Sequence, residues 1–397
     1  MSIEPNCASL QTQLLHESRA AHPFHPRVAP LYQTTTYQQF DLSNAATHTY
    51  SRCSNPSISA LEDALGTLEG LPFATAYSTG MAAISTLALA FLKSGDHVIL
   101  GRSVYGGTIR LFQKLLINLG VSSSVVDTTD LASLEFALEQ QPTRLVFIET
   151  PGNPTLCVTD IAVAADLAHK QGAMLAVDNT FLTGVLQRPS DLGADFVVLS
   201  TTKFVEGHNT SLGGAILHRD PAHQERLLFV RKTLGNIQSP FQAWLTLNGL
   251  RTLPLRLAAH CRNAERVAAY LDQHPSIKRV LYPGLRSSKG YAVASRQQSG
   301  FGGVVSFVLK GDLAEARTFL QNLRLVTLAE NLGSLETLIT HPATMTHSDL
   351  SDHDRNALGL TDGFLRLSVG IEGANDILRD IEQSLTKTFT GGETCLA

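Results

Sequence analysis

The sequence predicts an α/β protein built on a mostly parallel sheet, with an N-terminal arm before it and a smaller α+β domain after it. From about residue 56 to about residue 217, short apolar runs alternate with stretches of helical periodicity, as in a parallel sheet covered by helices on both faces. The length of 397 residues also exceeds what one compact core usually holds. We therefore expect two domains.

The domain limits follow from changes in pattern along the chain. Residues 1–53 are irregular, and their X-Pro pairs (His22-Pro23, His25-Pro26 and Ala29-Pro30) favour extended backbone. We expect this arm to lack a core of its own and to contact a neighbouring subunit. Residues 54–250 are predicted to form the α/β domain, and residues 251–397 the C-terminal α+β domain.

The elements of the α/β domain are assigned from apolar spacing. Apolar residues at helical spacing predict helices over 56–70, 80–93, 109–119, 131–139 and 161–170. Short apolar runs predict strands over 98–100, 124–126, 145–148, 174–177, 196–199 and 214–217. Downstream, a long helix is expected over 254–271 and strands over 304–309 and 364–369, with helices between and after them.

Composition excludes several classes of function. The net charge is −4 with no run of Lys or Arg, so nucleic acid is not expected as a partner. No apolar stretch approaches the roughly 20 residues that cross a bilayer, and no signal-peptide pattern opens the chain. The cysteines are scattered, which predicts no disulfide framework and no metal site, and favours a cytoplasmic location: Cys7, Cys53, Cys157, Cys261 and Cys395.

Two charged residues stand at the ends of predicted strands, where ligands bind in parallel sheets. Asp178 ends one apolar run, and Lys203 follows another in Ser200-Thr201-Thr202-Lys203. This pair suits pyridoxal phosphate (PLP), because a lysine can form the covalent link to its aldehyde and an aspartate can keep its pyridine nitrogen protonated. The alternatives are a solvated lysine and an aspartate that caps the next segment.

A phosphate site is predicted beside this pair. Gly80 and Met81 open a helix after Thr79, so backbone N–H groups are available to hold an anion. The hydroxyl groups of Ser200 and Thr202 can donate to the same phosphate. The alternatives are an ordinary N-cap at Thr79 and a polar loop after a strand.

Three further segments carry candidate ligand-binding groups. Arg52, next to Tyr50 in the arm, is a bidentate phosphate partner or else a solubilising side chain. Tyr105 precedes two glycines and can stack on a cofactor ring or pack on the core. Arg366 lies within an apolar strand, where it needs either a substrate carboxylate or an internal salt bridge.

Taken together, these segments resemble the Cys/Met-metabolism (trans-sulfuration) PLP-dependent enzymes, which include cystathionine γ-synthase and γ-lyase. The resemblance runs from about residue 30 to about residue 385. The matching stretches are 48–52 with Asn55-Pro56, 79–84, 104–108, 149–154, 177–181, 200–203, 282–285 and 366–372.

The resemblance implies the aspartate aminotransferase-like fold (fold type I) and a homotetramer built from dimers that share active sites. Lys203 and Tyr105 are implied to be the catalytic residues. By the same resemblance, Lys203 holds the cofactor and moves protons, Tyr105 stacks on the ring and can act in proton transfer, and Asp178 lies on the pyridine nitrogen. The remaining implied roles are phosphate binding by Gly80, Met81, Ser200 and Thr202 with Tyr50 and Arg52 of a neighbouring subunit, and substrate binding by Asn153 and Arg366.

Other positions bear on the reaction, a γ-replacement or a γ-elimination. Gly107 stands where methionine γ-lyases carry a cysteine, whereas Arg110 resembles cystathionine-handling members. Glu336, followed by Thr337, is expected to recognise the distal amino group of the substrate. The leading hypothesis is condensation of an O-acylhomoserine with cysteine, supported also by the synthase-like segments Phe181-Leu182 and Leu328-Ala329-Glu330. The alternatives are cystathionine γ-lyase and O-acylhomoserine sulfhydrylase.

Several residues depart from the family pattern and concern the choice of substrate rather than the cofactor. They are Thr49, Ile58, Glu206, Asn209, Thr210, Ser334 and Thr337. A protein of this fold that binds partners without catalysis is disfavoured, because Lys203, Asp178, Tyr105 and Arg366 are all retained. A nucleotide-dependent oxidoreductase is also disfavoured, because no GxGxxG motif follows the first strand.

Overall fold

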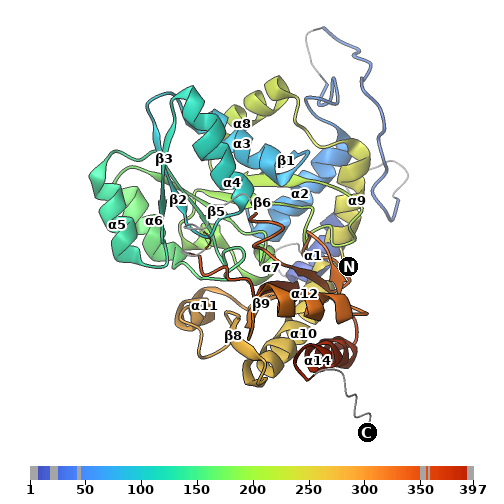
Figure 1. Cartoon of the computed structure of the whole chain (residues 1–397). Helices are drawn as coiled ribbons and strands as arrows, with labels where there is room; N and C mark the ends of the chain where they lie inside the picture. The colour runs from blue at the N-terminus through green and yellow to red at the C-terminus, as the bar shows by residue number, and fades with distance from the viewer. Residues whose placement is uncertain (1–7, 18–25, 43–45, 349–354, 356–357, 391–397) are drawn as a thin grey trace.

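The computed structural model describes residues 8–17, 26–42, 46–348, 355 and 358–390, and it contains two sheets, of seven and five strands (Figure 1). Both sheets lie beyond the arm, one on each side of the proposed boundary at residue 250. Cys7, Cys395 and the expected extended segment around His22-Pro23 lie outside the described residues.

The larger sheet has the strand order β1-β7-β6-β5-β4-β2-β3. Its strands are β1 (Phe73–Tyr77), β2 (His97–Gly101), β3 (Ser122–Val126), β4 (Leu145–Glu149), β5 (Met174–Asp178), β6 (Phe196–Leu199) and β7 (Gly214–His218). The strands from β3 across to β6 are parallel to one another, whereas β7 is antiparallel to both β6 and β1. The predicted mostly parallel α/β architecture is therefore confirmed.

Helices cover both faces of this sheet (Figure 1). They are α2 (Pro56–Glu69), α3 (Gly80–Phe91), α4 (Gly106–Arg110), α5 (Leu131–Gln140), α6 (Ile161–Lys170), α7 (Thr183–Leu186), α8 (Pro221–Leu234) and α9 (Pro240–Leu250). Successive side chains of a strand point to opposite faces. Val98 and Leu100 thus pack with α3 and α8, whereas Ile99 packs with α5 and α6.

Local sequence explains where these helices begin and end. In α2, the side chain of Asn55 accepts a hydrogen bond from the Ser57 N–H, and Pro56 occupies the first helical turn. The helix ends at Gly70, whose φ of 68° is left-handed and therefore favours glycine.

Three local expectations were wrong. β1 was not predicted, because its sequence FATAY mixes small and polar residues and lacks a continuous apolar run. The expected helix over 109–119 is instead α4 followed by a π-helical turn η2 (Leu111–Leu115) and a 3-10 turn η3 (Leu116–Leu119). The arm also contains a helix, α1 (Leu10–Glu17), which packs on α2 through the buried Leu14.

The smaller sheet has the order β10-β11-β12-β9-β8 and is antiparallel except between β10 and β11. Its strands are β8 (Ile277–Leu281), β9 (Val304–Leu309), β10 (Thr327–Leu328), β11 (Leu338–Thr340) and β12 (Phe364–Ser368). The accompanying helices are α10 (Leu253–Gln273), α11 (Tyr291–Gln297), α12 (Leu313–Asn322) and α14 (Ala374–Phe389). This unit contributes β12 and the segment after β10 to the site described next.

Candidate active site

A pocket of about 530 Å³ lies beyond the carboxyl ends of β4, β5 and β6, where the two sheets face each other. Ten of the predicted site residues line it: Gly80, Met81, Tyr105, Arg110, Asn153, Asp178, Ser200, Thr202, Lys203 and Arg366. The lining also includes residues to which the sequence analysis gave no role, among them Thr180, Thr346 and Ser348. The structure therefore brings together segments that are far apart in the sequence.

Asp178 and Lys203 come from adjacent strands. Asp178 is the last residue of β5, and its partner across the ladder is Val198 of β6, five positions before Lys203. Burial raises the pKa of Asp178 to about 6, even though its carboxylate accepts a hydrogen bond from the Thr180 N–H at 3.0 Å. Burial and the nearby Arg366 lower the pKa of Lys203 to about 8, which favours an amine that can exchange protons near neutral pH.

Glu149 lines the pocket, although the sequence analysis gave it no role. It pairs with Asp178 across the β4–β5 ladder and is buried. Its carboxylate accepts a hydrogen bond from the Tyr105 N–H at 2.8 Å. Burial and the charge of Asp178 raise the pKa of Glu149 well above its usual range. Glu149 therefore fixes the backbone of Tyr105 at the pocket.

The start of α3 forms a cradle beside Lys203. The Thr79 side chain caps the helix by accepting from the Ala82 N–H at 2.9 Å. An added Cβ at Gly80 would lie 2.9 Å from the Ser200 Cβ, so only glycine lets the helix start approach this strand end. The first N–H groups of a helix have no partner within it. They are available to an anion beside the Ser200 hydroxyl group.

Thr202 is held more tightly than Ser200. Its hydroxyl group donates to the Gly213 carbonyl at 3.2 Å and accepts from the Gly213 N–H at 2.9 Å. The Ser200 N–H donates to the Thr180 hydroxyl group at 2.8 Å. These contacts fix the loop that carries Lys203 on both sides of that residue.

Tyr105 stands at the mouth of the pocket and is 43% exposed. A Cβ built at Gly107 would lie only 2.5 Å from the Tyr105 Cε1 and 3.0 Å from the Met81 Sδ. The glycine therefore creates the space in which the tyrosine ring lies.

Arg366 projects from β12 into the opposite side of the pocket. Its guanidinium group donates to the Asn153 Oδ1 at 2.8 Å, to the Asn331 carbonyl at 3.1 Å and to the Thr340 hydroxyl group at 3.2 Å. Burial lowers the pKa of Arg366 to about 10, which leaves it charged at neutral pH. Its buried Nε has no hydrogen-bond partner among the described residues, and an anionic ligand would satisfy it.

Of the two glutamates in the connection between β10 and β11, one lines the pocket and the other does not. Glu330 lines the pocket with Lys203 and Arg110, whereas Glu336 does not line it. Glu336 lies instead on an adjacent groove together with Thr210 and Gln242. Glu330 lies near the start and Glu336 near the end of the segment that joins β10 to β11, and sequence spacing alone did not show which one faces the pocket.

Thr337 also lies outside the pocket, because its hydroxyl group is used in internal structure. The Thr337 side chain is fully buried, donates to the Glu372 carboxylate at 2.8 Å and accepts from the Gly370 N–H at 2.9 Å. Neither Glu336 nor Thr337 lines this pocket, and their expected role in substrate binding remains a prediction.

Tyr50 and Arg52 do not line their own chain's pocket. Arg52 donates to the Lys232 carbonyl at 2.6 Å, and its guanidinium group lies 5.5 Å from the centre of the Tyr50 ring. Tyr50 is 44% exposed. Their role in a neighbouring subunit's site remains a prediction.

Within the residues that the structure describes, no group of three or more His, Cys, Asp or Glu side chains could hold a metal ion. None of the described helices has the length and apolar character needed to cross a bilayer. The three described cysteines, Cys53, Cys157 and Cys261, are free thiols.

Comparison with known proteins places this site in a family. The model of the Cys/Met metabolism PLP-dependent enzymes matches residues 11–386. The chain belongs to this family. It is therefore an enzyme that uses PLP, as its strand-end lysine and aspartate predicted.

The names of the individual relatives state different activities. The chain is 43% identical to a cystathionine gamma-lyase of Bacillus subtilis, over 90% of this chain and 93% of that protein. It is 39% identical to an L-methionine gamma-lyase of Fusobacterium nucleatum, over 97% of this chain and 100% of that protein. A cystathionine gamma synthase of Xanthomonas oryzae, solved with aminoacrylate and cysteine, superposes with a TM-score of 0.94 at 40% identity, over 96% of this chain and 99% of that chain.

The residues present fit PLP. The open helix start at Gly80 beside Ser200 suits the phosphate. A positively charged ring nitrogen next to Asp178 would offset the burial that raises the pKa of this carboxyl group. Lys203 and Arg366 lie on the lining of the same pocket, one for the aldehyde and one for a substrate carboxylate.

Proposed function

We propose that this enzyme catalyses γ-replacement, joining an O-acylhomoserine to cysteine in the manner of a cystathionine γ-synthase. The observation that carries the proposal is that Arg110 and Glu330 both lie on the lining of the Lys203 pocket, which suits an enzyme that handles cystathionine. The distal end of cystathionine has both a carboxylate and an ammonium group, and a cation with an anion matches both. The similarity to a solved cystathionine gamma synthase supports this choice.

The chemistry divides between the cofactor and the chain. Bound PLP supplies an electron sink that makes the α-hydrogen of an amino acid acidic. Arg366 binds the α-carboxylate, and Asn153 orients Arg366 through their 2.8 Å hydrogen bond. Lys203 removes the α-proton and returns protons to carbon, for which the lowered pKa of about 8 is suited. Tyr105, fixed by Glu149, covers the opening of the pocket.

A second candidate function is cystathionine γ-lyase activity, which yields cysteine, 2-oxobutyrate and ammonia. The similarity to the Bacillus subtilis cystathionine gamma-lyase favours it. The Arg110–Glu330 pair serves cleavage as well as synthesis, because cystathionine is the product of one reaction and the substrate of the other. Sulfhydrylation of the ester is a third outcome of the test below.

The purified holoenzyme should be given O-succinylhomoserine or O-acetylhomoserine with cysteine, the same esters with sulfide, and cystathionine alone. We expect cysteine-dependent formation of cystathionine to have the highest kcat/KM. Faster release of 2-oxobutyrate from cystathionine would overturn the synthase assignment in favour of the lyase. Homocysteine formed from sulfide with no cystathionine formed from cysteine would show a sulfhydrylase.

The two glutamates near β10 and β11 offer a matched pair for testing substrate binding. Glu330→Gln is expected to raise KM for cysteine about 10-fold or more, because it removes the charge that pairs with an ammonium group. Glu336→Gln, which changes the same charge outside the pocket, should leave KM within about 2-fold of wild type. Equal effects of the two substitutions would contradict the assignment of Glu330.

A further inference from the structure

The loop after Lys203 differs from the usual family pattern, and its contacts reach back to the Lys203 amino group. The loop is Glu206-Gly207-His208-Asn209-Thr210, in which Glu206, Asn209 and Thr210 are three of the departures named above. Glu206 is 1% exposed, so its carboxylate is buried under the loop.

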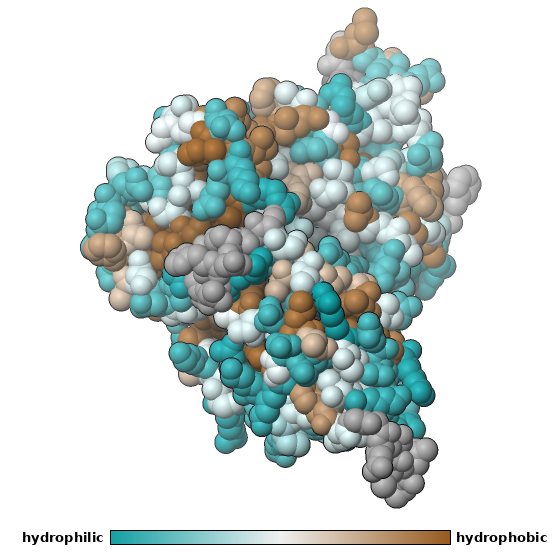
Figure 2. All heavy atoms as spheres, viewed as in Figure 1, coloured by the Kyte–Doolittle hydropathy of each residue, from teal (hydrophilic) through white to brown (hydrophobic). Residues whose placement is uncertain are grey.

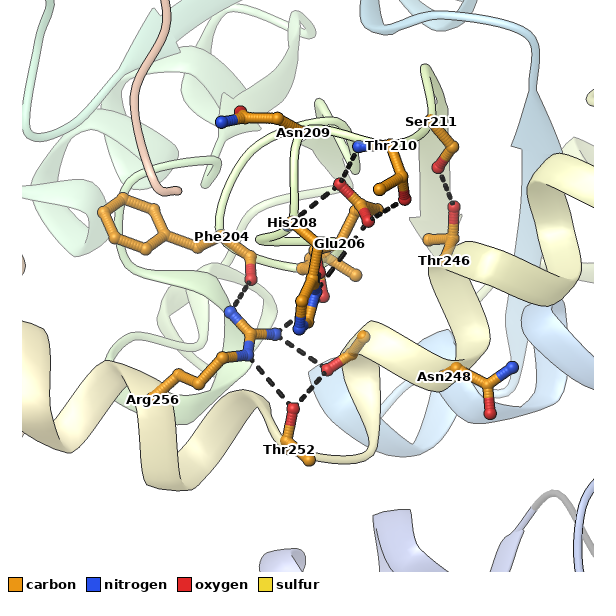
Figure 3. A network of polar contacts seen from close by, with 12 residues as sticks. Phe204, Glu206, His208, Asn209, Thr210, Ser211, Thr246, Asn248, Thr252 and Arg256 are labelled. Carbon is orange, nitrogen blue, oxygen red and sulfur yellow. Dashed lines mark hydrogen bonds and ion pairs between the residues drawn. The ribbon is translucent and has the colours of Figure 1, made fainter. Parts of the chain in front are cut away.

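The buried Glu206 carboxylate holds the loop together. It accepts hydrogen bonds from the N–H groups of His208 at 3.1 Å and Thr210 at 3.2 Å, and from the Thr210 hydroxyl group at 2.6 Å (Figure 3). The residue between these donors, Asn209, has a φ of 58°, in the left-handed region that asparagine tolerates. The carboxylate therefore stabilises a turn that the backbone alone disfavours.

The base of the loop is fixed from the other side by Arg256 of α10. Its guanidinium group donates to the carbonyls of Phe204 at 2.8 Å and Val205 at 3.0 Å, and to that of Gly249 at 2.7 Å (Figure 3). A Cβ at Gly249 would lie 2.2 Å from the Glu206 carbonyl oxygen, so α9 packs directly on the loop backbone. The backbone of the loop is therefore held against both α9 and α10.

The tip of the loop connects to Lys203 through two carboxamide groups. The Lys203 Nζ donates to the Asn331 Oδ1 at 2.5 Å, and the Asn331 Nδ2 donates to the Asn209 Oδ1 at 2.5 Å. The Asn331 backbone carbonyl also accepts from Arg366 at 3.1 Å. Asn331 thus lies between the amine that moves protons and the guanidinium group that binds the substrate.

We propose that Glu206 and Asn209 are positioning residues for Lys203, acting through the carboxamide of Asn331. Lys203 carries protons only while its amino group is not bonded to the cofactor, and in that form it donates to Asn331. Asn209 orients this carboxamide so that its oxygen faces Lys203, and Glu206 holds Asn209 in place. The inference rests on the proposed role of Lys203, and it is the same whether the enzyme is a synthase or a lyase.

The test measures, by NMR, the rate at which the holoenzyme exchanges the α-hydrogen of L-alanine for deuterium in D₂O. This measurement reports proton transfer by Lys203 without any γ-reaction. Asn209→Ala should lower the exchange rate roughly 3- to 10-fold, as expected for loss of one orienting hydrogen bond. Because Asn209 is exposed, the absorbance spectrum of the bound cofactor should not change, whereas the melting temperature should fall slightly, since alanine tolerates a φ of 58° less well than asparagine does. Asn248→Ala, an asparagine of α9 that donates to the Trp244 carbonyl, is the matched control.

Glu206→Ala should lower the exchange rate by a similar factor and also lower the melting temperature. The double variant with Asn209→Ala should exchange no more slowly than the slower single variant, since both changes act through one chain of contacts. Glu206→Gln, which keeps an acceptor for the loop N–H groups, should recover most of the rate.

Three results would overturn the inference. If Asn209→Ala exchanges at the wild-type rate while Lys203→Ala abolishes exchange, the positioning role is wrong and the role of Lys203 stands. If the rate losses of the two single variants multiply in the double variant, Glu206 and Asn209 act independently and the proposed chain of contacts is wrong. Exchange that survives in Lys203→Ala would remove the proposed role of Lys203 and the inference with it.

Discussion

At the scale of single residues, the site depends on small side chains as much as on charged ones. Gly80 lets a helix start approach Ser200, and Gly107 leaves space for the Tyr105 ring. The charged residues were predictable, because Asp178 and Lys203 follow strands of a parallel sheet and such strand ends converge. The choice between Glu330 and Glu336 was not predictable, because it depends on the turn between β10 and β11.

The crowding at Gly107 gives the first prediction. Gly107→Cys should lower kcat at least about 10-fold, because the new Cβ displaces the Tyr105 ring or the Met81 side chain. Gly107→Ala adds the same Cβ without sulfur and should lose activity to a similar extent. Steady-state kinetics of both variants check this, and full activity in the alanine variant would show that crowding is not the cause.

Asp178 leads to a prediction about pH. Its pKa of about 6 means that the carboxylate becomes protonated as the pH falls through that value. Protonated Asp178 cannot pair with a positively charged ring nitrogen, so the affinity for PLP should fall between about pH 8 and about pH 5. Fluorescence titration of cofactor-free protein measures this. Asp178→Asn should bind weakly at both pH values, and an unchanged wild-type Kd would contradict the assignment.

At the scale of elements, most of the helices and strands followed from apolar spacing, and the misses have physical reasons. β1 is stabilised by its pairing with β7 rather than by a strongly apolar sequence of its own. The π-helical turn at 111–115 keeps the same apolar spacing as the helix before it, so periodicity could not separate the two. α1 forms because Leu14 packs on α2, a contact that the local sequence does not reveal.

The junction of α2 and α7 gives a prediction about stability. Glu69, the last residue of α2, is fully buried and accepts from the Gly184 N–H of α7 at 2.6 Å. Burial raises the pKa of Glu69 to about 8. The folded protein binds the proton of Glu69 more tightly than the unfolded chain does. The contribution of Glu69 to the stability is therefore greatest below its unfolded pKa of about 4.5, and it is lost as the pH rises to about 8. Glu69→Gln should flatten this fall in melting temperature, whereas an unchanged slope would contradict the pKa shift.

The connection between α14 and β10 gives another prediction. The Asp380 side chain of α14 accepts from the N–H groups of Arg324, Leu325 and Val326, just before β10. Asp380→Ala leaves these partly buried donors without an acceptor and should destabilise the protein by about 2–4 kcal/mol. Chemical denaturation measures the loss. Glu382→Ala, on an exposed part of the same helix, is the control and should cost less than about 1 kcal/mol.

At the scale of the whole molecule, the division into two sheets was predictable from the change of pattern near residue 250. A contribution of a second chain to the site remains a prediction that rests on the family resemblance. Large apolar side chains are exposed on the arm and on η2 and η3, and hydrophobic residues gather on the face near α4 (Figure 2). Exposed apolar groups of this extent favour packing against another subunit.

We propose that the active unit is a dimer that shares its sites, within a homotetramer. Lys203→Ala homomers and Arg52→Ala homomers should both be nearly inactive. Unfolding and refolding them together should restore activity to about a quarter of wild type, because half of randomly paired dimers contain one intact site of two. Activity assays with size determination of the mixture test this. No recovery in a mixture that does form mixed dimers would place Arg52 outside the partner's site.

The three acceptors around Arg366 have a consequence for substrate binding. Its guanidinium group is already oriented by Asn153, Asn331 and Thr340 and is buried in β12. An arginine that is free in solution loses rotamer entropy when it binds a carboxylate, whereas Arg366 has lost that freedom during folding. The carboxylate site that we propose at Arg366 is thus preorganised by the fold before any amino acid binds.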